Sequence, residues 1–311
     1  MSNNIRFKKN SLAVAVIAVL SAPATQALEI DATVEYTLDG SPITTTHSEN
    51  ASTGTVDVLA GSSSPTSNVF YHTYGSTNGN FGSRVDGNGV YDITGTFTYS
   101  NTIFNTSGID LAYAFSFDII PGEISVNGIP DVGEFANSSY SIDVSLDGNS
   151  IFDSAASLNL VNGSAPTFSD SGSTSLGGSY NAGADYARYN WGTYSDTLDL
   201  GVFGSGDSFD LVYTLVAHAD GNCLSSSSGT NDRNLDDDFG FDGSEGGTNC
   251  GSLSRSGDPF QFGNQGNFAS ISSTPANASD VPEPASLALM GIGLAGIAGS
   301  VKRRRKKLNK K

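Results

Sequence analysis

The chain has 311 residues and a formal net charge of −17. Its basic residues gather at the two ends: only four arginines and no lysine lie between residues 10 and 301, whereas all 32 acidic residues lie between Glu29 and Glu283. Such a negative body repels phosphate backbones and anionic lipid, which excludes a nucleic-acid-binding protein.

Residues 1–27 predict a secretory signal peptide. Basic residues at positions 6–9 precede an uncharged run, Ser11–Ala24, and small residues follow it at Thr25 and Ala27. This order is typical of an export signal, and the apolar run is too short to favour a membrane span. We expect cleavage after Ala27, which makes Leu28 the first mature residue. An uncleaved membrane anchor is the alternative.

The body from Leu28 to Asp280 alternates between apolar and polar residues, which is typical of half-buried strands. In one example, Leu111, Tyr113, Phe115, Phe117 and Ile119 share a face. No amphipathic helix is convincing in this region. The stretches with the clearest alternation are 29–38, 90–99, 111–120, 140–146 and 209–217.

Turn chemistry agrees with these strands. Asp147-Gly148 separates two of them, and a two-residue hairpin needs residues that tolerate positive φ. Without crossover helices a parallel sheet is excluded. The sequence therefore predicts an all-β domain, an antiparallel β-sandwich that is jelly-roll-like, over residues 28–280.

Two cysteines, Cys223 and Cys250, are the only ones in the chain. In an exported protein such a pair predicts a disulfide. This disulfide would close a loop, 223–250, that contains the acidic stretch Asn231–Gly247. Its oxygen ligands suit Ca²⁺, although the spacing does not fit an EF-hand, and a solvated acidic loop is the alternative. The candidate calcium ligands are Asp232, Asp236, Asp238 and Asp242.

An aromatic stretch, residues 185–194, contains the single tryptophan of the chain. On a strand Tyr189 and Trp191 share one face, where their rings could stack on sugar rings. The alternative is that both rings pack in the core or at a sheet edge.

Catalytic patterns are absent from the sequence. It has no HExxH, GxSxG or Walker motif, and His47, His72 and His218 stand apart from one another. We expect no enzymatic activity. A glycoside hydrolase stays open as an alternative, because sequence spacing in a β protein does not reveal two carboxylates that face each other across a cleft.

The C-terminal segment, 281–311, has three elements in order. Pro282, Glu283 and Pro284 come first, an uncharged run of residues 287–301 follows, and a cluster of Lys and Arg ends the chain. The run predicts a short membrane helix, and the basic cluster holds its end on the cytoplasmic side. This arrangement resembles the PEP-CTERM sorting segment of Gram-negative bacteria.

The resemblance implies a route and a processing partner. Proteins with this segment are exported, held transiently in the inner membrane, and processed by an exosortase-type enzyme at the Pro282–Pro284 motif. They then reach the outer surface or the extracellular matrix, commonly with exopolysaccharide and biofilm. We therefore expect a structural or adhesive protein of an exopolysaccharide layer. A carbohydrate-binding module is one alternative, and a polysaccharide-active glycoside hydrolase is the other.

Overall fold

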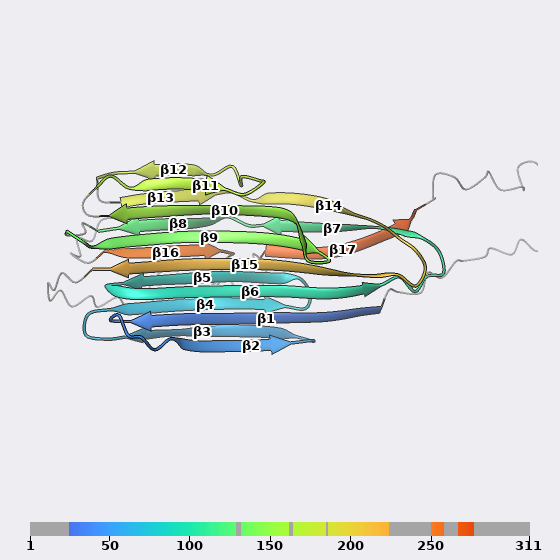
Figure 1. Cartoon of the computed structure of the whole chain (residues 1–311), viewed down its shortest axis with the longest axis horizontal. Coiled ribbons are helices and arrows are strands. Elements are labelled where there is room, and N and C mark those ends of the chain that lie inside the picture. The colour runs from blue at the N-terminus through green and yellow to red at the C-terminus, as the bar shows by residue number, and fades with distance from the viewer. Residues whose placement is uncertain are drawn as a thin grey trace, which may run out of the picture.

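The computed structural model describes residues 25–128, 132–161, 164–184, 186–223, 250–257 and 267–276. Within these ranges the chain forms strands and no helix, and every strand pairing is antiparallel. Figure 1 shows these strands running along the long axis of the molecule.

The first sheet has seven strands in the order β11-β10-β9-β15-β6-β1-β2. Its longest strands are central, and β6 pairs with β15 over fifteen residues. The strands are β1 (Thr25–Leu38), β2 (Thr45–Ala51), β6 (Val90–Phe104), β9 (Phe135–Leu146), β10 (Asn149–Val161), β11 (Thr167–Ser171) and β15 (Ser208–Asn222).

The second sheet has ten strands. They are β3 (Thr55–Ser63), β4 (Asn68–Ser76), β5 (Asn80–Asn88), β7 (Leu111–Ile119), β8 (Gly122–Asn127), β12 (Ser179–Ala182), β13 (Tyr186–Trp191), β14 (Tyr194–Phe203), β16 (Gly251–Ser256) and β17 (Asn267–Pro275). The pairings place β17, β7 and β14 side by side beyond the ends of β16, β8 and β13, as Figure 1 also shows. Between β7 and β8 the break falls at Pro121, which has no backbone N–H to donate to a ladder.

The core lies between the two sheets, where the apolar faces of the longer strands meet. Phe81 of β5 lies edge-on to Tyr213 of β15 with 4.7 Å between ring centroids. Farther along, Phe117 of β7 meets Phe152 of β10 at 5.0 Å. Both contacts join one sheet to the other, so the buried rings hold the two layers together.

The expected fold class is confirmed at the level of an all-β, antiparallel, sandwich-like protein. The five stretches with strong alternation lie in β1, β6, β7, β9 and β15, and only Ile120, at the end of the third stretch, falls outside its strand. The expected hairpin is also present: Asp147 and Gly148 have φ of 49° and 76° and connect β9 to β10. Gly148 tolerates this geometry because it has no Cβ.

The two ends of the chain fall largely outside the described residues. Residues 1–24 of the expected signal peptide (1–27), the sorting motif and the expected C-terminal membrane helix all lie in this part, so both the signal peptide and the helix stay predictions. Among the described residues no helix is long and apolar enough to cross a membrane. The backbone of residues 25–27 does lie in β1, where it pairs with residues 102–104.

Candidate binding face on the second sheet

Strand β13 presents two different faces. Tyr189 and Trp191, the candidate stacking pair, point into the core and are 2% and 3% exposed. The Trp191 ring lies 4.4 Å from that of Tyr140, centroid to centroid, and the Tyr189 hydroxyl accepts a hydrogen bond from the backbone N–H of Gly178. Neither ring offers a face to a ligand in this position. The positions of Tyr189 and Trp191 agree with the alternative to sugar stacking, which is that both rings pack in the core.

The opposite face of β13 carries Tyr186, Arg188 and Asn190. Alternation along the strand turns these side chains to the outside of the sandwich. In the antiparallel register Asn190 lies opposite Glu123, Arg188 opposite Ser125, and Tyr186 opposite Asn127. We call this surface the β13–β8 face. It consists of these six residues of β13 and β8 together with Arg255 of β16, which lies next to Glu123.

Glu123 organises this face. Its side chain is only 3% exposed, and its Oε2 atom accepts hydrogen bonds from Nη2 of Arg188 and, at 3.0 Å, from Nη2 of Arg255. Nε of Arg188 also donates to Oδ1 of Asn190 at 2.8 Å. A buried carboxylate is tolerated when charged partners compensate it. Buried Glu123 therefore holds both guanidinium groups in place, while the side chains of Arg188 and Arg255 stay partly exposed to solvent.

Two polar atoms of β8 have no hydrogen-bond partner among the described residues. They are Oγ of Ser125 and Oδ1 of Asn127, both buried at the atom level. Leaving such a group unpaired costs about 1–3 kcal/mol, so a buried atom of this kind needs an explanation. Tyr186, which lies opposite Asn127, is 43% exposed. The exposed part of the face thus combines the ring of Tyr186 with the guanidinium groups of Arg188 and Arg255, and the two unpartnered atoms lie buried beside them.

Sequence reasoning did not find these residues, although the signal was present. The alternation that puts Tyr189 and Trp191 on one face puts Tyr186, Arg188 and Asn190 on the other. Both faces carry aromatic rings, so the strand alone does not tell which is outside. Glu123 and Arg255 are more than 60 residues away from Arg188 in the sequence, and only sheet pairing brings them together.

A second cluster lies on the outer face of the first sheet, around His218 of β15. Its Nε2 atom lies 3.2 Å from Oδ1 of Asp92, and its Nδ1 lies 3.9 Å from Oδ1 of Asp220. The hydrogen bond with Asp92 raises the pKa of His218, and the same bond lowers the pKa of Asp92. Burial raises the pKa of Asp220. Uncharged Thr94 and Ser139 lie opposite His218 on β6 and β9.

The His218 cluster predicts a pH dependence of stability. Because the folded-state pKa is raised above the ordinary 6.5, protonated His218 stabilises the fold fully below that pH, and this stabilisation is lost as the pH rises through the folded pKa. We expect His218→Gln to lower the melting temperature at about pH 5.5 and to change it little at about pH 8.5. Thermal melts across this pH range measure the difference in melting temperature between the wild-type protein and the variant. A difference that grows as the pH rises would contradict the raised pKa of His218.

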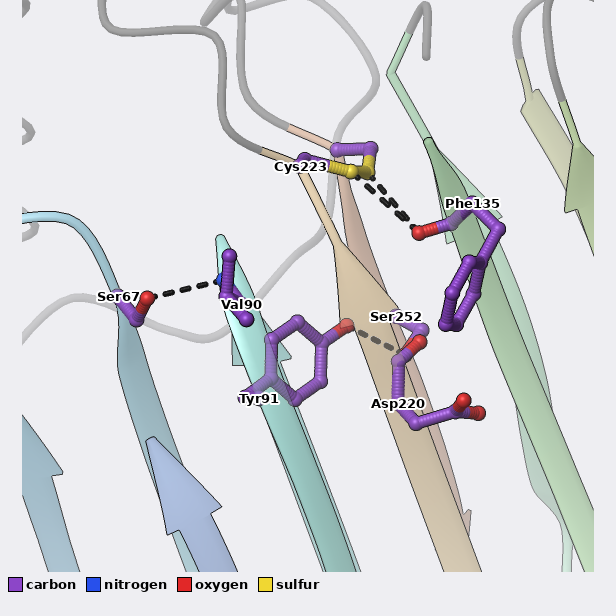
Figure 2. The surroundings of a disulfide bond; sticks show 8 residues. Ser67, Val90, Tyr91, Phe135, Asp220, Cys223 and Ser252 are labelled. Carbon is purple, nitrogen blue, oxygen red and sulfur yellow. Dashed lines mark hydrogen bonds between the residues drawn. A yellow bond between two sulfur atoms is a disulfide. The ribbon is translucent and has the colours of Figure 1, made fainter. Parts of the chain in front are cut away.

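The disulfide joins the two sheets at one end of the sandwich. Cys223 follows β15 of the first sheet and Cys250 precedes β16 of the second, with 5.9 Å between their Cα atoms. Figure 2 shows the pair beside Phe135, whose carbonyl oxygen lies 3.4 Å from both sulfur atoms. Nearby, the hydroxyls of Tyr91 and Ser252 bond at 2.6 Å between the sheets. The expected pairing of the cysteines is present in the structure.

The candidate calcium ligands lie between the cysteines, at residues 232–242, and so outside the described residues. In the parts of the chain that the structure describes, no group of three or more His, Cys, Asp or Glu residues is arranged to hold a metal ion. Calcium binding by Asp232, Asp236, Asp238 and Asp242 stays a prediction.

Comparison with known proteins identifies one segment. Residues 280–305 match the family model of the PEP-CTERM protein-sorting motif. No curated protein and no solved structure matches the chain. The match includes Pro282, Glu283 and Pro284 and confirms the resemblance noted in the sequence. The chain therefore carries a PEP-CTERM sorting motif, which implies export, processing by an exosortase, and membrane-associated sorting to the surface.

Proposed function

We propose that this protein is a non-enzymatic adhesive component of an exopolysaccharide layer and that it holds polysaccharide on the β13–β8 face. The observation that carries the proposal is the half-exposed ring of Tyr186 next to Arg188 and the unpartnered polar atoms of Ser125 and Asn127. The sorting motif supports the place of action, because it directs the chain toward the cell surface.

Sugars match this combination of groups. The apolar C–H faces of a pyranose ring stack on an aromatic ring, and its hydroxyls both donate and accept hydrogen bonds. Arg188 and Arg255 supply exposed donors that Glu123 holds in place, and Ser125 and Asn127 add a hydroxyl and an amide that lie buried on the same face of the sheet. Orientation by few, well-placed polar groups beside an apolar surface is the common design of ligand sites.

Tyr186→Ala should reduce binding to immobilised polysaccharide. Loss of a stacking ring removes about 0.5–1.5 kcal/mol beyond the buried area, so we expect at least a several-fold rise in Kd. Surface plasmon resonance on a panel of neutral and acidic polysaccharides measures this. The matched control is Phe104→Ala, which removes an aromatic ring of similar exposure, 41%, from the end of β6 in the other sheet.

The same panel separates the alternatives. Binding without release of reducing sugars supports an adhesive or carbohydrate-binding protein, whereas release of oligosaccharides would favour a glycoside hydrolase. Binding to no polysaccharide would overturn the adhesive proposal and leave a purely structural role. Equal losses in Tyr186→Ala and Phe104→Ala would place the binding surface elsewhere on the molecule.

Processing at both ends is a further prediction. Intact-mass measurement of the cell-surface protein should show that the basic tail, residues 302–311, is absent, and Glu283→Ala should leave the protein at the inner membrane. Cleavage after Ala27 gives Leu28 as the first residue and removes three residues of β1. Cleavage after Ala24 would keep the strand whole, and the mass distinguishes the two. A mature protein that still carries residues 302–311 would contradict exosortase processing.

A further inference from the structure

We propose that the polysaccharide held by the β13–β8 face carries carboxylate groups, and that Arg188 and Arg255 recognise them. This inference rests on the proposed function and adds the chemical class of the ligand. It begins from three facts of the structure: the arginines have spare donors, they carry more charge than Glu123 neutralises, and an unpartnered hydroxyl lies opposite one of them.

The spare donors follow from the contacts. Arg188 uses Nε for Asn190 and Nη2 for Glu123, and Arg255 uses Nη2 for Glu123. Among the described contacts this leaves Nη1 of Arg188, and Nε and Nη1 of Arg255, without a bond. Their side chains are 42% and 32% exposed, so these groups are open to a ligand. A guanidinium with two free N–H groups binds a carboxylate through paired, charge-assisted hydrogen bonds.

The charge of the site is opposite in sign to that of the body. Two guanidinium groups share one carboxylate, that of Glu123, so the site keeps one positive charge in excess. Among the described residues, the neighbouring strand β5 carries Arg84 opposite Arg255 and also Asp86, and these two form an ion pair at 2.9 Å that adds no net charge. The charged groups around His218 lie on the other sheet, on the opposite side of the core. At physiological ionic strength the Debye length is about 8 Å, so the nearest charges dominate what a bound group senses. An acidic sugar is therefore attracted here although the whole chain is negative.

Ser125 completes the site. It lies opposite Arg188 on β8, its residue is 7% exposed, and its hydroxyl has no partner among the described residues. The flanking Ile124 and Val126 are buried in the core, which turns Ser125 to the same side as the arginine. The Oγ atom itself is buried, so a carboxylate or a sugar hydroxyl reaches it only if neighbouring side chains shift when the ligand binds. A carboxylate at this point would satisfy a buried group that otherwise stays unpaired.

The test uses two polymers with the same backbone, of which only one carries free carboxylates. Polygalacturonate and its methyl-esterified form share a backbone, and the ester removes the negative charge. Binding is measured at about 0.15 M NaCl, where long-range repulsion is screened. EDTA is present so that divalent cations cannot bridge two acidic partners. Because hydrogen bonds to charged groups contribute about 1.5–3 kcal/mol, we expect polygalacturonate to bind at least about tenfold more tightly than the ester.

Variants of Arg188 and Arg255 test whether these two residues cause the preference for polygalacturonate. Arg188→Gln should abolish most of the tenfold preference for polygalacturonate over the ester. Arg255→Gln should reduce the preference as well. Tyr186→Ala, in contrast, should weaken binding to both polymers by the same factor, because stacking does not depend on charge. Circular dichroism and thermal melts confirm that each variant is folded.

The outcomes separate this inference from the proposed function. Equal binding of the wild-type protein to both polymers would overturn carboxylate recognition and leave polysaccharide adhesion intact. Binding to neither polymer nor to any member of the wider panel would overturn the proposed function itself. A preference for polygalacturonate that Arg188→Gln and Arg255→Gln both preserve would also overturn the assignment. The wild-type comparison needs no variant, so a variant that fails to fold does not weaken the test.

Discussion

Replacement of Trp191 by alanine should lower the free energy of unfolding by about 3–5 kcal/mol, the range for loss of a buried aromatic side chain. The indole is 3% exposed and packs on the ring of Tyr140 from the other sheet. Gly122 lies beneath it: a Cβ there would stand 2.3 Å from Cζ2 of Trp191, so the sheet is shaped around this ring. Truncation therefore leaves a cavity that the rigid neighbouring strands cannot fill.

Urea denaturation followed by circular dichroism measures this loss. Tyr186→Ala is the matched control on the same strand, because its ring lies on the open face, and we expect it to cost less than about 1 kcal/mol. The pair of variants also separates the two faces of β13. Loss of polysaccharide binding without loss of stability in Trp191→Ala would reverse our assignment of the faces.

Removal of the disulfide should lower the free energy of unfolding by about 3–4 kcal/mol in the chain-entropy model. Cys223 and Cys250 are 27 positions apart, and their bond ties a strand of the first sheet to a strand of the second. Without it the unfolded chain gains the conformational freedom of an open loop of this length. We expect the urea midpoint of Cys223→Ala/Cys250→Ala to fall accordingly.

A reducing agent provides the control for this variant. Dithiothreitol should lower the midpoint of the wild-type protein toward that of the double variant and should leave the double variant unchanged. A wild-type midpoint that does not respond to reduction, with free thiols verified by mass spectrometry, would show that the bond adds nothing to stability.

The sequence determines the strands and the routing of this protein, because both depend on local patterns. Alternation with a period of two places Leu111 through Ile119 on β7 with every second side chain in the core. The hairpin at Asp147-Gly148 follows from residues that tolerate positive φ. Because an exported protein reaches an oxidising compartment, its two cysteines predict a disulfide. The three ordered elements at the C-terminus identify the sorting motif from the sequence alone.

Tertiary structure alone decides which face of a strand is outside and which strands are neighbours. Both faces of β13 carry aromatic rings. Trp191 is buried and Tyr186 is exposed because the first sheet packs against only one of these faces. The β13–β8 face is built from residues 123, 188 and 255, which β8, β13 and β16 bring together through antiparallel register. Pairing between strands this far apart in sequence is set by the packing of the whole sandwich, since no local pattern specifies a partner.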